Sequence, residues 1–196
     1  MVMRLSPRFD DALSYANRLH AGQPRKGSDI PYIAHLLAVT AIVLDYGGTE
    51  DEAIAALLHD AIEDQGGAAT RDEIRRRFSE QVVAIVDGCT DAETILKPPW
   101  RERKEAYVAH IGDASRSVRL VSAADKLHNV RSILADYRQV RDEVWKRFTG
   151  ERDGTLWYYR ALADAFRAVE PSPLVEELDR AVRELEHLTA NPPNLP

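Results

Sequence analysis

Residues 55–67 read AALLHDAIEDQGG and place His59 and Asp60 side by side at the end of an apolar run. Glu63 and Asp64 follow one turn later, just before a glycine pair. Two acids at the C-terminal end of a helix oppose the helix dipole, and ionisable groups next to a buried run are costly to desolvate. This crowding of four ionisable side chains therefore predicts a functional site.

Helical periodicity extends through the rest of the chain. Glycine and proline separate the apolar segments, and no alternating β pattern persists. Thr49 with Glu52 predicts a capping box at the start of the helix that carries His59, and Thr70 with Glu73 predicts a second one. We expect an all-α fold in one domain over residues 1–196, with loop at 91–100 and a frayed tail at 191–196. The expected helices cover 7–20, 31–47, 50–66, 74–90, 101–110, 117–137 (the longest), 154–168 and 173–189.

Composition excludes several classes of protein. The net charge of -6 argues against a general nucleic-acid binder, which usually carries a basic excess. No apolar run approaches the roughly 20 residues of a membrane span, and the first ten residues lack the apolar core of a signal peptide. Cys89 has no second cysteine to pair with, which favours a reducing compartment. The sequence thus predicts a soluble, cytoplasmic protein, and it is silent on oligomeric state.

Histidine and aspartate also interrupt other apolar helical segments. His35 lies in PYIAHLLAV and Asp125 lies in LVSAADKL. An aspartate in a buried segment needs an ionic partner or a metal. Two imidazoles and two carboxylates from three helices would form a mixed nitrogen and oxygen site for a divalent ion, with Mn²⁺ favoured and other metals open. The alternative is that His35 is an ordinary core histidine and that Asp60 and Asp125 pair with Arg or Lys, which requires four separate coincidences.

The motifs occur in a recognisable order: RK at 25–26, PYIxH at 31–35, HDxxED at 59–64 and ADKLHN at 124–129. This order resembles the HD-domain metal-dependent phosphohydrolases. Within them it is similar to the hydrolase domain of the RelA/SpoT alarmone family and its stand-alone small alarmone hydrolases. The resemblance covers about residues 8–136 and leaves the helices at 140–190 unmatched. It implies Mn²⁺-dependent removal of the 3′-pyrophosphate from guanosine tetraphosphate or pentaphosphate, the alarmones of the stringent response.

The resemblance also implies roles for individual residues. Its metal ligands would be His35, His59, Asp60 and Asp125. Glu63 and Asp64 match the catalytic acidic pair. In a continuous helix, the i, i+4 spacing from His59 to Glu63 would bring a carboxylate within reach of a water at the metal.

Candidate substrate-binding residues flank these motifs. Arg25 can stack on a purine face, and Lys26 can reach a phosphate. The resemblance gives Asn129 and Ser132 a role in holding the nucleotide, and it places basic residues such as Lys97 and Arg101 near the phosphates. The plainer alternative for Asn129 and Ser132 is polar helix surface. For Lys97 and Arg101 it is an exposed helix start. The arginines at 75–77 are expected to form a solvated face.

The chain departs from the family pattern at several positions. Leu36 follows His35 where proline is common, and Ser122-Ala123 replaces a more usual Lys-Leu. The aromatic-rich segment 145–159 is expected to pack in the core, with closure of the nucleotide pocket as the alternative.

The substrate therefore stays open in the sequence. An adenosine counterpart of guanosine tetraphosphate is the second candidate. Another HD-type activity on a nucleotide, such as a nucleoside monophosphate or NADPH phosphatase, or a non-catalytic nucleotide-binding module, remains as an alternative. The presence of all six metal-binding and catalytic candidates counts against the last.

Overall fold

The computed structural model describes residues 4–90 and 98–191, and these contain helices but no named strand. The expectation of an all-α fold is thereby confirmed. The described residues divide into two compact units. The first contains residues 4–90 with Ala114–Asp125, and the second contains Pro98–Asp113 with residues 126–191. Within these ranges no helix is both long and apolar enough to span a membrane.

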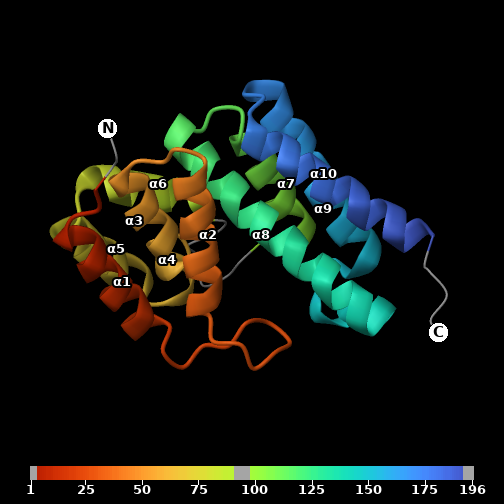
Figure 1. The fold of residues 1–196 in the computed structure, drawn as a ribbon, viewed down its shortest axis with the longest axis horizontal. Coiled ribbons are helices and arrows are strands. Elements are labelled where there is room, and N and C mark those ends of the chain that lie inside the picture. The colour runs from red at the N-terminus through yellow and green to blue at the C-terminus, as the bar shows by residue number, and fades with distance from the viewer. Residues whose placement is uncertain (1–3, 91–97, 192–196) are drawn as a thin grey trace. The chain divides into compact units, whose positions relative to one another are not determined.

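The first unit is built around one short central helix (Figure 1). This helix, α3, packs against α1, α2 and α6, and its side chains are buried from Glu52 through Leu58. A helix surrounded on all sides needs no polar face, which explains the unbroken apolar run in the sequence. The helices of the unit are α1 (Pro7–Leu19), α2 (Ile33–Asp45), α3 (Glu50–Leu58), α4 (Ala61–Asp64), α5 (Gly67–Arg77), α6 (Glu80–Cys89) and the first part of α8 (Arg116–Val140).

The start of α3 follows the sequence prediction. The Thr49 side chain accepts a hydrogen bond from the Glu52 backbone, and Glu52 accepts from the Thr49 amide at 2.7 Å, which completes the capping box. Gly48 precedes it because a Cβ there would collide with Val43 and press on Leu120. The close turn between α2 and α3 therefore requires glycine.

The end of α3 departs from the prediction. A single helix to Gly66 was the expectation, but α3 ends at Leu58 and α4 begins at Ala61. Asp60, between them, has φ -99° and ψ -1°, outside ideal helical values. In a continuous helix two successive side chains point about 100° apart. The break allows His59 and Asp60 to approach the same centre, and periodicity did not reveal it because Ala61 and Ile62 continue the apolar pattern.

The second predicted capping box is wrong. Thr70 lies inside α5, and its hydroxyl donates to the Gln65 carbonyl instead of capping a helix. The helix starts earlier because Gly66 turns the chain in the left-handed region, with φ 109°. The expected continuous helix through 74–90 is also interrupted, since Ser79 caps a separate α6 by accepting from the Val82 amide.

The arginines at 75–77 do not share one environment. The side chains of Arg75 and Arg76 are 42% and 71% exposed, as a solvated face requires. Arg77 is only 15% exposed, because it pairs with Asp11 and lies over the Tyr15 ring. The prediction is therefore wrong for Arg77.

The second unit holds the C-terminal helices. Trp145, Tyr158 and Tyr159 are buried there, which confirms core packing for these members of the 145–159 segment. Short connections join the last helices, and Ser172 caps α10 by accepting from the Val175 amide. The elements of the unit are α7 (Trp100–His110), α8 beyond Asp125, the 3₁₀ helix η1 (Arg141–Arg147), α9 (Glu151–Val169) and α10 (Pro173–Ala190).

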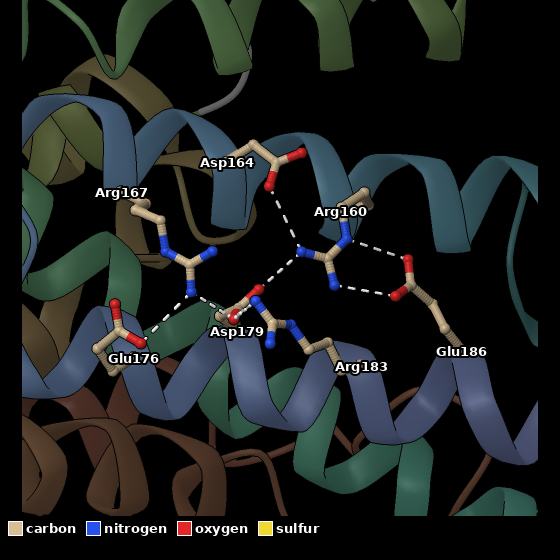
Figure 2. A network of polar contacts seen from close by, with 7 residues as sticks. All are labelled: Arg160, Asp164, Arg167, Glu176, Asp179, Arg183 and Glu186. Carbon is tan, nitrogen blue, oxygen red and sulfur yellow. Dashed lines mark hydrogen bonds and ion pairs between the residues drawn. The ribbon is translucent and has the colours of Figure 1, made fainter.

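A charged network joins α9 to α10 (Figure 2). At its centre Asp179 is 2% exposed and accepts from Arg160 at 2.7 Å, from Arg167, and from Arg183 at 2.8 Å. Arg160 also makes a two-point contact with Glu186, at 3.1 and 2.9 Å. The buried aspartate is therefore compensated by three guanidinium groups, and the two from α9, Arg160 and Arg167, also bind the helices together.

Candidate metal centre

Three buried side chains of the first unit converge on one point. His35 comes from α2, His59 follows the last residue of α3, and Asp125 comes from α8. Their exposures are 1%, 2% and 6%, and their potential ligand atoms all lie within 4.8 Å of one another. Buried apolar neighbours on each helix fix these side chains, because α2, α3 and α8 supply much of the core of the unit.

Asp60 lies beside this group as its partly exposed member. Its Oδ2 is 3.0 Å from Nε2 of His59 and 3.7 Å from Nε2 of His35. Its side chain is 25% exposed, and the Tyr32 hydroxyl donates to the same oxygen at 2.5 Å. The structure thus brings all four predicted ligands together, with Asp60 facing the more open side.

The tautomer of His59 shows which groups face one another in the cluster. Nδ1 of His59 lies 2.8 Å from the Ala56 carbonyl oxygen, which can only accept, so Nδ1 carries the proton. In the neutral ring Nε2 is then a lone-pair acceptor. It faces Asp60 Oδ2 at 3.0 Å and Asp125 Oδ1 at 3.7 Å, and in this neutral form it has no proton to donate to them. Three acceptors that face one another require a cation between them or a proton on Nε2.

The pKa directions agree with this charge imbalance. Burial lowers the pKa of His35, which keeps that ring neutral. Burial also disfavours a charged His59, but the charge of Asp60 and the hydrogen bonds of Asp125 and Asp60 outweigh it and raise the pKa of His59 well above its usual value. Without a metal, the cluster therefore holds a proton on His59. A divalent cation would displace that proton, as metal binding to imidazole generally does.

The donor set fits a divalent transition-metal ion. Two neutral imidazole nitrogens and two carboxylates are typical ligands of Mn, Fe and Zn. The contact from Nδ1 of His59 to a carbonyl is the usual second contact that orients a ligating histidine. The Tyr32 hydroxyl plays the same part for Asp60, because burial and the nearby carboxylates raise the pKa of Tyr32 and keep it protonated.

The acidic pair lies on α4. Because the helix breaks after Leu58, the i, i+4 relation of His59 and Glu63 on one continuous helix does not hold. The turn instead starts at Asp60, whose carbonyl accepts from the Asp64 amide at 2.9 Å. Partial desolvation raises the pKa of Asp64, a hydrogen bond from Gln23 lowers it, and the charges of Asp60 and Glu63 raise it again, with a net upward shift.

The loop between α1 and α2 holds residues that the sequence analysis did not identify. Gln23 Nε2 donates to Asp64 Oδ2 at 2.8 Å, and Tyr32 donates to Asp60. His20 is 2% exposed and stacks on Tyr32, with ring centroids 5.1 Å apart. The only sequence signal was the position of Tyr32 three residues before His35, because a loop has no periodicity to read.

The four predicted nucleotide-binding residues Arg25, Lys26, Asn129 and Ser132 come from two parts of the chain. Arg25 and Lys26 occur in the same loop, and the Arg25 guanidinium lies 5.8 Å from the centroid of the Tyr32 ring. On α8, Ser132 donates to the His128 carbonyl at 2.9 Å, and Asn129 is half-buried. The roles of these four residues in binding stay predictions.

The structure gives little support to the two predicted phosphate-binding residues near α7, Lys97 and Arg101. Lys97 falls outside the described residues. Arg101, in the second unit, pairs with Glu105 at 2.6 Å and lies 3.2 Å from the centroid of the Trp157 ring. Arg101 thus has partners within its own unit, and a contact with phosphate stays a prediction.

Comparison with known proteins defines the class. A family model for the HD domain matches residues 12–156, which include all four clustered side chains. The chain therefore belongs to the HD-domain family.

Several relatives make the relationship more specific. The guanosine-3′,5′-bis(diphosphate) 3′-pyrophosphohydrolase MESH1 of Xenopus tropicalis is 38% identical over 138 residues, which are 69% of this chain and 72% of that protein. The human protein of the same name is 37% identical over 126 residues, 63% of this chain and 68% of its own length. A GTP pyrophosphokinase of Streptomyces coelicolor is 34% identical over 64% of this chain, but the match spans only 15% of that longer protein.

Solved structures give the same result. A metazoan ortholog of SpoT, described as hydrolysing ppGpp, superposes with a TM-score of 0.77 at 26% identity, over 94% of this chain and 98% of the other. A crystal structure of a Listeria monocytogenes protein gives 0.69 at 28% identity, over 77% of this chain and 97% of the other. The predicted relationship to the RelA/SpoT-type hydrolases is confirmed.

Proposed function

We propose that this chain removes the 3′-pyrophosphate from guanosine 3′,5′-bis(diphosphate), with Mn²⁺ as the metal in use. The observation that carries the proposal is the buried cluster in which Nε2 of His59 faces the carboxylate oxygens of Asp60 and Asp125, at 3.0 and 3.7 Å. Support comes from relatives named as 3′-pyrophosphohydrolases of this nucleotide, two of them matched over about two thirds of their length or more.

His35, His59, Asp60 and Asp125 would hold the metal. A bound divalent ion supplies a Lewis acid that polarises the phosphate and lowers the pKa of water. The protein contributes the orientation of its ligands, through the Ala56 carbonyl at His59 and the Tyr32 hydroxyl at Asp60. Two imidazoles with two carboxylates suit Mn²⁺, and the same donors accept Zn²⁺ or Fe²⁺.

Glu63 and Asp64 would act on the attacking water. One carboxylate accepts a proton as the water oxygen bonds to the phosphorus attached to the ribose 3′-oxygen. The bond between that phosphorus and the 3′-oxygen breaks, and the 3′-oxygen takes up a proton. The products are pyrophosphate, which contains the water oxygen, and guanosine 5′-diphosphate. The raised pKa of Asp64 suits a group that both takes and returns a proton.

The loop between α1 and α2 would hold the other end of the nucleotide. Arg25 would stack on the purine, and Lys26 would contact phosphate. Asn129 and Ser132 on α8 are the proposed ribose and phosphate contacts, and Lys97 and Arg101 add positive charge. Guanosine is the first candidate base and adenosine the second.

The proposal also implies a cellular setting. A purine alarmone as substrate suggests a cytoplasmic enzyme of the stringent response, consistent with a chain whose one cysteine cannot form an internal disulfide. The substrate is a small molecule, and the acidic net charge offers no general affinity for nucleic acid.

Product identification tests the proposal. Chelator-treated protein is reconstituted separately with Mn²⁺, Mg²⁺ and Zn²⁺ and incubated with guanosine 3′,5′-bis(diphosphate) in ¹⁸O-labelled water. We expect equimolar guanosine diphosphate and pyrophosphate, fastest with Mn²⁺, with the label in pyrophosphate only. The adenosine analogue and NADPH serve as parallel substrates. Orthophosphate as the only product, or no cleavage of either 3′-pyrophosphorylated nucleotide, would overturn the proposal.

A further inference from the structure

A chain of polar contacts leads from Asp64, one of the two proposed catalytic acids, into the loop between α1 and α2. Gln23 donates from Nε2 to Asp64 Oδ2 at 2.8 Å. Its Oε1 accepts from Gln65 Nε2 at 2.6 Å and lies 2.8 Å from Nδ1 of His20. The Gln23 backbone carbonyl accepts from the Tyr32 amide at 2.8 Å, which fixes the loop at the same residue. Gln23 is thus held on its backbone and at both ends of its amide.

The chemistry of these partners fixes the direction of the Gln23 amide. An ionised Asp64 only accepts hydrogen bonds, so the amide nitrogen must face it. The amide oxygen then faces Gln65 and His20, and both must donate to it. His20 therefore carries its proton on Nδ1, and its buried Nε2 is an acceptor that makes no hydrogen bond. A reversed amide would put two acceptors together at Asp64, so only one orientation satisfies the network.

The rigidity of His20 strengthens this anchor. Its ring is buried and stacks on Tyr32 with an interplanar angle of 19°. Tyr32 is itself fixed by its hydrogen bond to Asp60. The loop therefore holds two carboxylates that lie one helical turn apart, Asp60 through Tyr32 and Asp64 through Gln23. Asp64 is otherwise exposed on α4, and free rotation there would separate its carboxylate from a fixed reaction centre.

We propose that Gln23, anchored by His20 and Gln65, is a positioning residue that orients the Asp64 carboxylate toward the attacking water. The proposal rests on the proposed catalytic role of Asp64. The Gln23 side chain donates directly to Asp64, whereas it reaches the proposed ligand Asp60 only through His20 and Tyr32, so the metal content of each variant reports on that second route. The same hydrogen bond favours the ionised carboxylate, and its loss should leave Asp64 protonated to a higher pH.

The test is a double-mutant cycle of Gln23→Leu and Asp64→Asn, with turnover, KM and bound metal measured for the four proteins. Gln23→Leu should lower kcat roughly 10- to 100-fold, the usual cost of losing an orienting second contact, with KM and metal content unchanged. The acid limb of its kcat profile should move to higher pH. In the Asp64→Asn background the same change should have little further effect, because the group on which Gln23 acts is gone.

Two further variants keep the test decisive. Gln23→Glu retains the length and the acceptor for His20 and Gln65 but places an oxygen against Asp64, so it should lower kcat at least as far as Gln23→Leu. Gln81→Leu, at an exposed position on α6, is the matched control and should behave as wild type.

The outcomes separate this inference from the proposed function. Wild-type kcat in Asp64→Asn would remove the catalytic role of Asp64 and this inference with it. A loss of activity in Asp64→Asn, combined with an additive or absent effect of Gln23→Leu or an unmoved acid limb, would overturn the role of Gln23 alone.

Discussion

Asp125 in the first unit and Asp179 in the second are both buried aspartates on helices, 6% and 2% exposed, but their surroundings are opposite. Asp179 forms ion pairs with arginines, with Arg160 at 2.7 Å and Arg183 at 2.8 Å. Asp125 lies beside two imidazole nitrogens, with His35 Nε2 at 3.2 Å and His59 Nε2 at 3.7 Å.

The difference lies in what compensates the buried charge. Guanidinium groups are always protonated, so the charge on Asp179 is balanced at every physiological pH. The imidazoles beside Asp125 are neutral in their metal-binding form, and Asp60 adds a second carboxylate. A buried aspartate surrounded by arginines is typical of a structural ion-pair network, whereas a buried aspartate beside histidines and another carboxylate is the arrangement expected of a metal site.

The largest effect is expected from Asp125→Ala. Removal of this carboxylate should abolish metal binding and lower turnover roughly a thousandfold or more, equivalent to about 4 kcal/mol of transition-state stabilisation. Metal content by elemental analysis and turnover measured on the same sample provide the check. A variant that keeps both full metal content and full turnover would show that Asp125 belongs to the same class as Asp179.

Glu63→Gln should have the next largest effect. The substitution keeps the shape and removes the charge, so metal should stay bound while turnover falls by roughly a hundredfold, the scale of general acid-base catalysis. Steady-state kinetics at saturating metal measures this. Unchanged turnover would make Glu63 a solvated helix residue without a catalytic role.

Asp179→Asn should affect stability and leave the chemistry intact. The change leaves Arg160 and Arg167 without their buried acceptor, although Glu186 and Glu176 still contact them. We expect a loss of about 2–3 kcal/mol in the free energy of unfolding, toward the lower end for a broken buried pair. Denaturant unfolding measures the loss, with Asp164→Asn on the exposed edge of the network as the milder control. Loss of bound metal in the still-folded variant would contradict the comparison.

The smallest expected effect is a pH dependence of the stability that Asp179→Asn removes. Burial raises the pKa of Asp179, but the hydrogen bonds from Arg160 and Arg167 dominate and lower it below its usual value. A depressed folded-state pKa contributes stability above the unfolded value of about 3.9, and this stability is lost as the pH falls through the folded-state pKa. The stability difference between wild type and Asp179→Asn should therefore be constant near neutrality and shrink below about pH 4. A difference that grows in acid would contradict the assignment.

The sequence predicted one of these two aspartates and not the other, for a physical reason. Asp125 is visible because most of its neighbours in LVSAADKL are apolar and because it belongs to the ADKLHN motif. Asp179 lies in VEELDRAV, which reads as the polar face of an amphipathic helix, and its burial depends on arginines 12 and 19 residues away along the chain. Periodicity reports the local face of a helix and carries no information about partners on another helix.

The same limit applies to the metal centre. The helices and the four candidate ligands followed from pattern and resemblance, because each ligand interrupts an apolar run. The break after Leu58 did not follow, since the apolar pattern continues across it. Gln23 and Tyr32 were missed because their roles depend on the path of an irregular loop, which becomes visible only when its hydrogen bonds are known.

The most direct test is calorimetric titration of Mn²⁺ into chelator-treated protein, with wild type, Asp125→Ala and Asp179→Asn measured under identical conditions. The account predicts one ion per chain for wild type and for Asp179→Asn, proton release on binding, and no binding for Asp125→Ala. Absence of Mn²⁺ binding to the wild type, or equal binding to the Asp125→Ala protein, would contradict the claim that Asp60 and Asp125 form a metal site with His35 and His59.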